Sequence, residues 1–247
     1  GITEHMPPLD DRFLYSDERV AGLDAKALQE RFSLYMETSR ALQQEYRDHI
    51  GIRVGFETEW YCGAGEYIKK LVKDHAPDYI VGSLHHVSDM PIDTTPEDYA
   101  KAAGALGGLD ALYERYFDEQ LQLVETVRPA IVGHFDLVRI FDPDYRQRLQ
   151  SRILARKVAR NLRVIKEMGL SLDFNLAGFD KPGGEPYPTL SVLEQALGMG
   201  IPVVPGDDSH SPGTVGRYWG RGLEMLRARG ASFDWEASLK HIGADNR

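Results

Sequence analysis

The chain has 247 residues, 29 of them basic and 38 acidic, and its formal charge is −9. This length suits one large α/β domain, and no shift in composition marks a linker, so we expect a single domain over residues 1–247. The acidic balance argues against a surface that neutralises phosphate backbones, so nucleic acid is not an expected partner. No apolar stretch approaches the ~18 residues that span a bilayer, so no membrane partner is expected either. The single cysteine, Cys62, fits a reducing compartment, and the cytoplasm is the default location.

Apolar runs that end in polar residues recur along the chain. The opening residues, GITEH, read as the end of such a run and suggest that upstream sequence precedes them. Residues 50–57 alternate apolar with small or polar side chains, the period of a strand, and Glu57 closes them. The other expected strands and their polar ends are 78–87 with His85, 129–137 with His134, 170–178 with Asn175, and 201–210 with Asp208.

Stretches with helical spacing separate these strands, at residues 17–48, 96–127, 144–168 and 188–199. Alternating strands and helices predict a parallel sheet, and repeated units of this length favour a closed β/α barrel. An open, doubly wound sheet would show the same alternation and is the alternative fold. No glycine-rich phosphate loop follows any strand, which weakens the nucleotide-binding form of that alternative.

The polar strand ends form a candidate metal site. The carboxyl ends of parallel barrel strands meet at one face, where imidazoles and carboxylates together suit Zn, Mn or Fe. A lone histidine at a strand end is more often a hydrogen-bonded structural group, but the same position recurs on several strands. One bridging carboxylate could hold two ions beside a phosphoryl group. The candidate ligands are His5, Glu57, His85, His134, Asp208 and His210.

Two positions in this set have a competitor nearby. Glu59 competes with Glu57, because both lie on one face of the same strand. His86 competes with His85, because neighbouring residues of a strand point to opposite faces and the register after Gly82 does not choose between them.

The last strand end and the basic residues also leave alternatives open. Asp207 or Asp208 could serve as a turn or helix-cap residue before SPGTV. Exposed basic side chains are common, yet some lie where they could contact a phosphate group. Those candidates are Arg139, Arg160, Lys181 and Arg217.

Six segments taken together resemble the polymerase and histidinol phosphatase superfamily, most closely its histidinol-phosphatase branch. They are GITEH, VGFETEW, YIVGSLHHV, VGHFDLV, LDFNLAGFDKPGGEPYP and GDDSHSPGTVG, in family order across nearly the whole chain. The resemblance implies a distorted seven-stranded β/α barrel with two or three divalent ions, Zn, Mn or Fe. It also implies a small phosphate ester as partner and hydrolysis of L-histidinol phosphate to L-histidinol and phosphate, a step of histidine biosynthesis. The alternatives are another small phosphorylated substrate or a non-catalytic metal-binding fragment.

Carried onto this sequence, the resemblance implies that Glu57 bridges two ions. His85 and His134 would complete the second ion, and Asp208 would hold the first. The resemblance favours His85 over His86, because the family ligand in the matching segment corresponds to His85.

Other residues of the resemblance concern a third ion, catalysis and the substrate. His5 and His210 would hold the third ion, and Asn175 matches a segment near the substrate pocket. The family begins with a strand that carries His-x-His, followed by another histidine, and none of these lies in this chain, so we expect the first barrel strand to be absent. Where relatives often carry a basic residue after AGF, this chain has Asp180, followed by Lys181. The implied catalytic residues are Glu57, Asp208 and His210.

Overall fold

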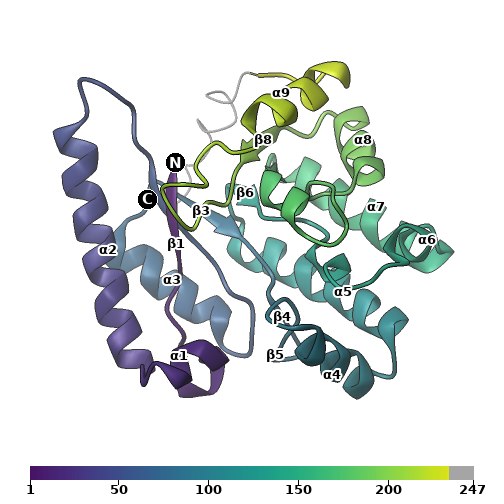
Figure 1. Cartoon of the computed structure of the whole chain (residues 1–247), viewed down its shortest axis with the longest axis horizontal. Helices are drawn as coiled ribbons and strands as arrows, with labels where there is room; N and C mark the ends of the chain where they lie inside the picture. Colours follow the sequence, from purple (N-terminus) through teal and green to yellow (C-terminus); the bar gives the residue numbers. More distant parts are fainter. Residues whose placement is uncertain (234–247) are drawn as a thin grey trace.

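A computed structural model describes residues 1–233. Six parallel strands form one sheet in the order β1-β2-β3-β6-β7-β8 (Figure 1). Sheet neighbours follow one another along the chain, without the reversal of order that defines a doubly wound sheet. The strands are β1 (Ile2–His5), β2 (Val54–Glu57), β3 (Tyr79–Gly82), β6 (Ile131–Val132), β7 (Ser171–Asn175) and β8 (Val203–Gly206).

The sheet curls like part of a barrel. Its first strand, β1, and its last, β8, approach one another at their carboxyl ends, where the ring of His5 lies 6.4 Å from that of His210. Within residues 1–233, no strand pairs with the outer edge of β1 or of β8. The expected α/β class is therefore confirmed, and the described sheet is a parallel, barrel-like one of six strands.

Helices cover the outer face of this sheet. The long helix α2 packs against β1 and β2, α5 against β3, and α9 against β8. None of the helices in residues 1–233 is long and apolar enough to cross a membrane. The helices are α1 (Ser16–Val20), α2 (Ala25–Glu45), α3 (Ala64–His75), α4 (Pro96–Leu106), α5 (Leu109–Val127), α6 (Tyr145–Leu149), α7 (Arg152–Glu167), α8 (Leu190–Gly198) and α9 (Trp219–Ala228), and a short hairpin joins β4 (His86–Val87) to β5 (Met90–Pro91).

The first three helical stretches of the sequence each form two helices. Gly22 takes a positive φ of 72° after α1, and Asp24 then caps α2 by accepting a hydrogen bond from its first turn. Gly107 and Gly108, both with positive φ, separate α4 from α5. Ser151 caps α7 and separates it from α6. The sequence did not predict α9 or the β4–β5 hairpin.

Strand register decides which side chains face the inside of the curl. His5 pairs with Glu57 across β1 and β2, so both point to the same face. Phe56, one residue earlier, points outward and packs edge-on against Phe32 of α2, with ring centroids 5.6 Å apart. The strand pairings through β3 and β6 place Asp173 of β7 on the same inner face. Polar groups therefore gather inside, while the apolar core lies between the sheet and its helices.

Candidate metal centre

Three imidazoles converge on the carboxylate of Glu57, the last residue of β2. Oε1 of Glu57 lies 3.0 Å from Nε2 of His134 and 3.6 Å from Nε2 of His85. Its other oxygen lies 3.6 Å from Nε2 of His5. The Nε2 atoms of His85 and His134 are 3.0 Å apart. The structure thus brings four of the six expected ligands together, each from the carboxyl end of a different strand.

This group suits a divalent cation. Donor atoms of Glu57, His85 and His134 all lie within 4.8 Å of one another. Two imidazole nitrogens and a carboxylate oxygen are ligands that zinc takes in catalytic sites. When neither Nε2 carries a proton, the lone pairs of these two atoms repel each other. A bound cation would accept both lone pairs. The residues present therefore fit a metal ion.

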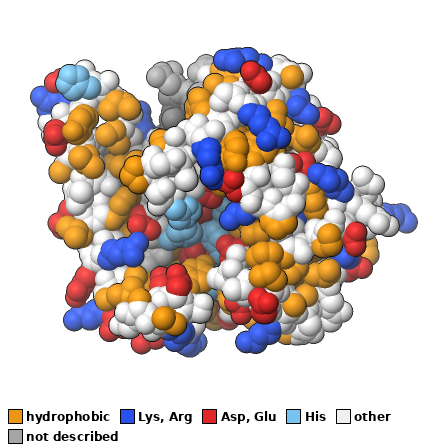
Figure 2. Space-filling view, viewed as in Figure 1, with side chains coloured by type: hydrophobic (Ala, Val, Ile, Leu, Met, Phe, Trp, Pro, Cys, Tyr) orange, Lys and Arg blue, Asp and Glu red, His pale blue; other side chains and the backbone are white. Residues whose placement is uncertain are grey.

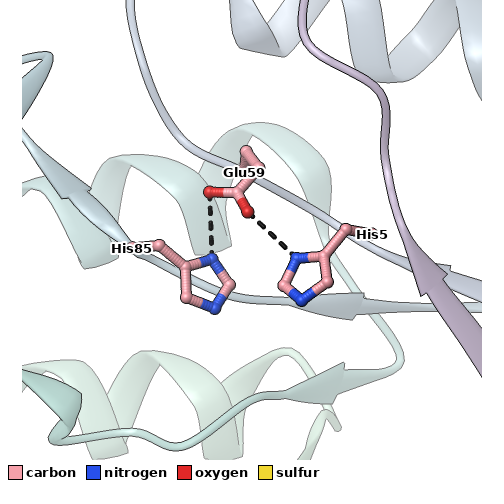
Figure 3. A group of neighbouring side chains, drawn as sticks. All are labelled: His5, Glu59 and His85. Atoms are coloured by element: carbon pink, nitrogen blue, oxygen red, sulfur yellow. Dashed lines mark hydrogen bonds and ion pairs between the residues drawn. The ribbon is translucent and has the colours of Figure 1, made fainter. Parts of the chain in front are cut away.

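Glu59 lies on the other side of two of these rings (Figure 3). It accepts a hydrogen bond from Nδ1 of His5 at 3.0 Å and forms an ion pair with Nδ1 of His85 at 2.9 Å. Nδ1 of His86 also lies 3.3 Å from Glu59. Strand alternation does not separate the two neighbouring histidines, because β3 ends at Gly82, before either of them. Both rings are buried, and His85 reaches Glu57 as well.

The charges of this cluster stabilise one another. Burial favours the neutral form of Glu57, but the imidazoles of His5, His134 and His85 outweigh it and hold the pKa of this carboxyl well below its usual range. Burial likewise opposes the charge of His5, yet Glu57 and Glu59 raise the pKa of that imidazole to about 9. The metal-free cluster therefore holds ionised carboxylates against a protonated His5 at neutral pH, and a bound cation would displace protons from it.

Asp208 and His210 lie on the loop after β8, beside the metal cluster, where the ring of His210 is 6.4 Å from that of His5. Oδ2 of Asp208 accepts a hydrogen bond from Asn175 at 3.2 Å. The His210 side chain is 75% exposed, and its Nδ1 lies 2.9 Å from the carbonyl oxygen of Asp208. Asp207 instead accepts a hydrogen bond from the backbone of Gly216 at 2.5 Å. Of the two adjacent acids, Asp207 thus secures the loop, and Asp208 connects to the site.

Asp173 lies beside this site and was not among the expected residues. It accepts a hydrogen bond from Asn175 at 3.0 Å, and the backbone N–H of His134 lies 3.5 Å from the same oxygen. Burial, with the nearby charge of Asp208, raises the pKa of Asp173 to about 7, although His134 acts in the opposite direction. Its position two residues before Asn175 in an expected strand was the available signal, because both then share one face.

This raised pKa predicts a pH-dependent stability in the metal-free protein. The folded-state pKa lies above the ordinary 3.8, so the contribution of Asp173 to the free energy of unfolding falls as pH rises from about 4 to about 7, then levels off. Asp173→Asn, which cannot ionise, should therefore gain stability relative to the unsubstituted chain across that window. Urea unfolding of both proteins with a chelator would measure the difference. A difference that is constant with pH would contradict the prediction.

A pocket opens between β8 and the segment after β7. Asp208 and His210 line it together with Lys181. Asp180 binds both Arg217 and the Tyr218 hydroxyl. Figure 2 shows histidine side chains in a hollow, with acidic and basic groups around it. Two of the candidate phosphate contacts, Lys181 and Arg217, therefore line this pocket. Of these two, Arg217 forms an ion pair with Asp180 and Lys181 does not.

Two of the expected phosphate contacts have their guanidinium groups in use elsewhere. Arg160, on α7, binds Asp118 at 2.9 Å and the carbonyl of Phe117 on α5, so it joins two helices. Arg139 is 1% exposed and donates to the carbonyls of Glu185 and Pro186 at 2.9 and 2.8 Å. Both guanidinium groups hold backbone and helices in place, and their role as phosphate contacts stays a prediction.

The position of Arg139 predicts a structural defect on its removal. Its guanidinium also lies over the ring of Tyr187, 4.0 Å from the centroid. Arg139→Met should lower the free energy of unfolding by about 3 kcal/mol, because two buried carbonyls lose their donor. Urea denaturation measures this loss. Unchanged stability with a raised KM for a phosphate ester would instead identify Arg139 as a substrate contact.

Comparisons with known proteins place the chain among phosphatases. No protein-family profile matches it. It is 34% identical over 220 residues to the probable histidinol-phosphatase of Schizosaccharomyces pombe, covering 87% of this chain and 71% of that protein. A crystal structure of a proposed histidinol phosphatase from Listeria monocytogenes matches with a TM-score of 0.78 and 24% identity, over 89% of this chain and 86% of that one.

A second solved structure shares the fold at lower similarity. It is histidinol phosphate phosphatase from Lactococcus lactis, complexed with Zn, L-histidinol and phosphate. The TM-score is 0.62 and the identity 19%, over 81% of this chain and 75% of that one. Both structures support the barrel-like α/β fold described above.

Proposed function

The chain belongs to the histidinol-phosphatase family. We propose that the protein is a metal-dependent phosphomonoesterase that hydrolyses L-histidinol phosphate to L-histidinol and phosphate, in histidine biosynthesis. The observation that carries the proposal is the convergence of three imidazole Nε2 atoms on Glu57 at the carboxyl end of the sheet. The Lactococcus lactis relative, whose structure holds Zn, L-histidinol and phosphate, supports both the metal and the substrate. The single cysteine agrees with the cytoplasm as its location.

Glu57 is proposed as the central ligand. A divalent ion bound there would activate water and neutralise the charge that develops on the phosphoryl group. Glu57 has two oxygens and faces imidazoles on both, which supports a role in holding two ions. Asp208, fixed by its hydrogen bond from Asn175, is oriented at the rim between the cluster and the pocket. The residues proposed to hold two or three ions of Zn, Mn or Fe are His5, Glu57, His85, His134, Asp208 and His210.

The pocket beside Asp208 is proposed to receive the phosphate ester. Lys181 offers three N–H donors and a positive charge there, which suit a phosphate dianion. Asn175 is proposed to act through Asp208, since its amide group donates to that carboxylate and lies 3% exposed beneath the loop.

A seventh parallel strand between β1 and β8 is proposed to close the barrel, as in the polymerase and histidinol phosphatase superfamily that the sequence resembles. The approach of the two edge strands at their carboxyl ends supports this. Such a strand, bearing His-x-His, would add ligands to the metal centre. Zinc bound per chain, measured for this chain and for one extended upstream by that strand, tests the proposal: the extended chain should bind more ions.

A substrate panel tests the proposed reaction. Phosphate release is measured with zinc from L-histidinol phosphate, O-phosphoserine, glycerol phosphate and p-nitrophenyl phosphate. The kcat/KM for L-histidinol phosphate should exceed that for the others by at least about tenfold. Preference for another ester would support a different small substrate, and a chain that binds zinc but hydrolyses none would be a non-catalytic metal-binding protein.

A further inference from the structure

We propose that Glu59 is not a metal ligand but a positioning residue, which holds the Nδ1 atoms of His5 and His85 so that both rings turn Nε2 toward Glu57. The inference deepens the proposed function and rests on it in one respect, namely that the metal binds on the Nε2 side of the rings.

Glu57 and Glu59 contact opposite sides of the same two imidazole rings. His5 has its Nδ1 3.0 Å from Glu59 and its Nε2 3.6 Å from Glu57. His85 repeats the arrangement, with Nδ1 2.9 Å from Glu59 and Nε2 3.6 Å from Glu57. Figure 3 shows the carboxylate of Glu59 between the two rings, with one oxygen toward each. One carboxylate thus aligns two imidazoles that come from separate strands.

Glu59, His5 and His85 also place ligand atoms within 4.8 Å of one another, as a metal site would, but the carboxylate of Glu59 already has four side-chain partners. A carboxylate offers about four lone-pair positions, two on each oxygen. On Oε1, the ring of His5 and the hydroxyl of Tyr15, at 3.2 Å, occupy both. On Oε2, the rings of His85 and His86, at 2.9 and 3.3 Å, do the same. Glu59 therefore accepts hydrogen bonds from His5, Tyr15 and His86 and forms an ion pair with His85.

Packing keeps Glu59 itself in place. The residue is 4% exposed, and the ring of His86 packs against those of Tyr15 and Tyr61, with centroids 5.5 and 5.9 Å away. These rings come from three separate segments and close over the carboxylate. Glu57, in contrast, receives its histidine contacts from Nε2 atoms alone.

Loss of Glu59 and loss of Glu57 should change metal binding in different ways. An imidazole whose N–H is held by a carboxylate keeps one ring orientation and one tautomer, and its other nitrogen becomes a better donor. Loss of such an outer partner typically weakens metal binding by about 10–100-fold without removing a ligand. Loss of a direct ligand, by contrast, lowers the number of ions that bind.

Glu59→Gln tests the proposal, because the amide keeps the shape but cannot accept from both sides. Zinc affinity is measured by competition with a chromophoric chelator, and zinc per chain by metal analysis at saturation. We expect an affinity about 10–100-fold weaker with zinc per chain unchanged. In the zinc-loaded protein, ¹⁵N NMR should show Nδ1–H with metal-bound Nε2 for His5 and His85. The variant at full zinc content should keep that tautomer, but its Nδ1–H signals should lose the downfield shift that a hydrogen bond to a carboxylate causes.

Asn161→Ala is the matched control, because Asn161 is a buried polar residue that bonds Phe117 and Gln120 between α5 and α7. It should lower stability while leaving zinc affinity unchanged. If Glu59→Gln does not fold, Glu59→Asp replaces it: the shorter carboxylate cannot span both rings, and the same weakened affinity at full zinc content is expected.

Either of two results would overturn the proposal: fewer zinc ions per chain at saturation, which would make Glu59 a ligand, or an affinity equal to that of the unsubstituted chain. Failure of the proposed reaction is distinguishable, because it would appear as zinc bound without hydrolysis of L-histidinol phosphate in the unsubstituted chain. The comparison of affinities would still stand.

Discussion

Glu57→Gln should remove zinc from the cluster and lower kcat/KM for L-histidinol phosphate by at least about 10²–10³-fold. The neutral amide is a poor zinc ligand, and it leaves the imidazoles of His5, His85 and His134 without the carboxylate that they face. Metal content and turnover should therefore fall together, as measured by metal analysis and phosphate release on the same preparation.

Glu66→Gln is the matched control for this substitution. Glu66 is 84% exposed on α3, where it pairs with Lys69, so the same change of charge there should alter neither quantity. A Glu57→Gln protein with normal zinc content and normal turnover would refute the role of Glu57 as the central ligand.

The second large effect is expected at Asp208. Asp208→Asn should lower kcat/KM by at least about 10²-fold, because the carboxylate that Asn175 orients toward the site loses its charge. Asp207→Asn should have a much smaller effect, because its amide oxygen can still accept the bond from Gly216 that secures the loop. Steady-state kinetics on the two variants measure both values.

This pair of substitutions is internally controlled, since the residues are adjacent and carry the same charge. A larger loss in Asp207→Asn than in Asp208→Asn would exchange their roles. Equal losses would mean that the loop as a whole, rather than the Asp208 carboxylate, matters for turnover.

The sequence predicted the fold class and strand ends well because both depend on local patterns. Apolar runs that end in Glu57, His134 and Asn175 are short strands, and in a parallel sheet their ends meet on one side. The strand expected at residues 50–57 is shorter, beginning at Val54, and Ile50 is 58% exposed. Alternation alone does not say where along a run the pairing with a neighbour starts.

What the sequence could not predict depends on distant contacts. Glu59 looked like a rival of Glu57 because strand alternation places both on one face, but β2 ends at Glu57 and the chain then turns Glu59 to the other side of the same rings. Arg139 looked like a phosphate contact because it follows a strand end. Its burial on Tyr187 arises from residues nearly fifty positions later, which no local pattern reveals.

Phosphate release from L-histidinol phosphate, with added zinc and beside a chelated control, tests the central claim most directly. Release should require the metal, stop on chelation and return when zinc is restored. Release that persists in the chelator would contradict that claim, because hydrolysis would then proceed without the centre built around Glu57.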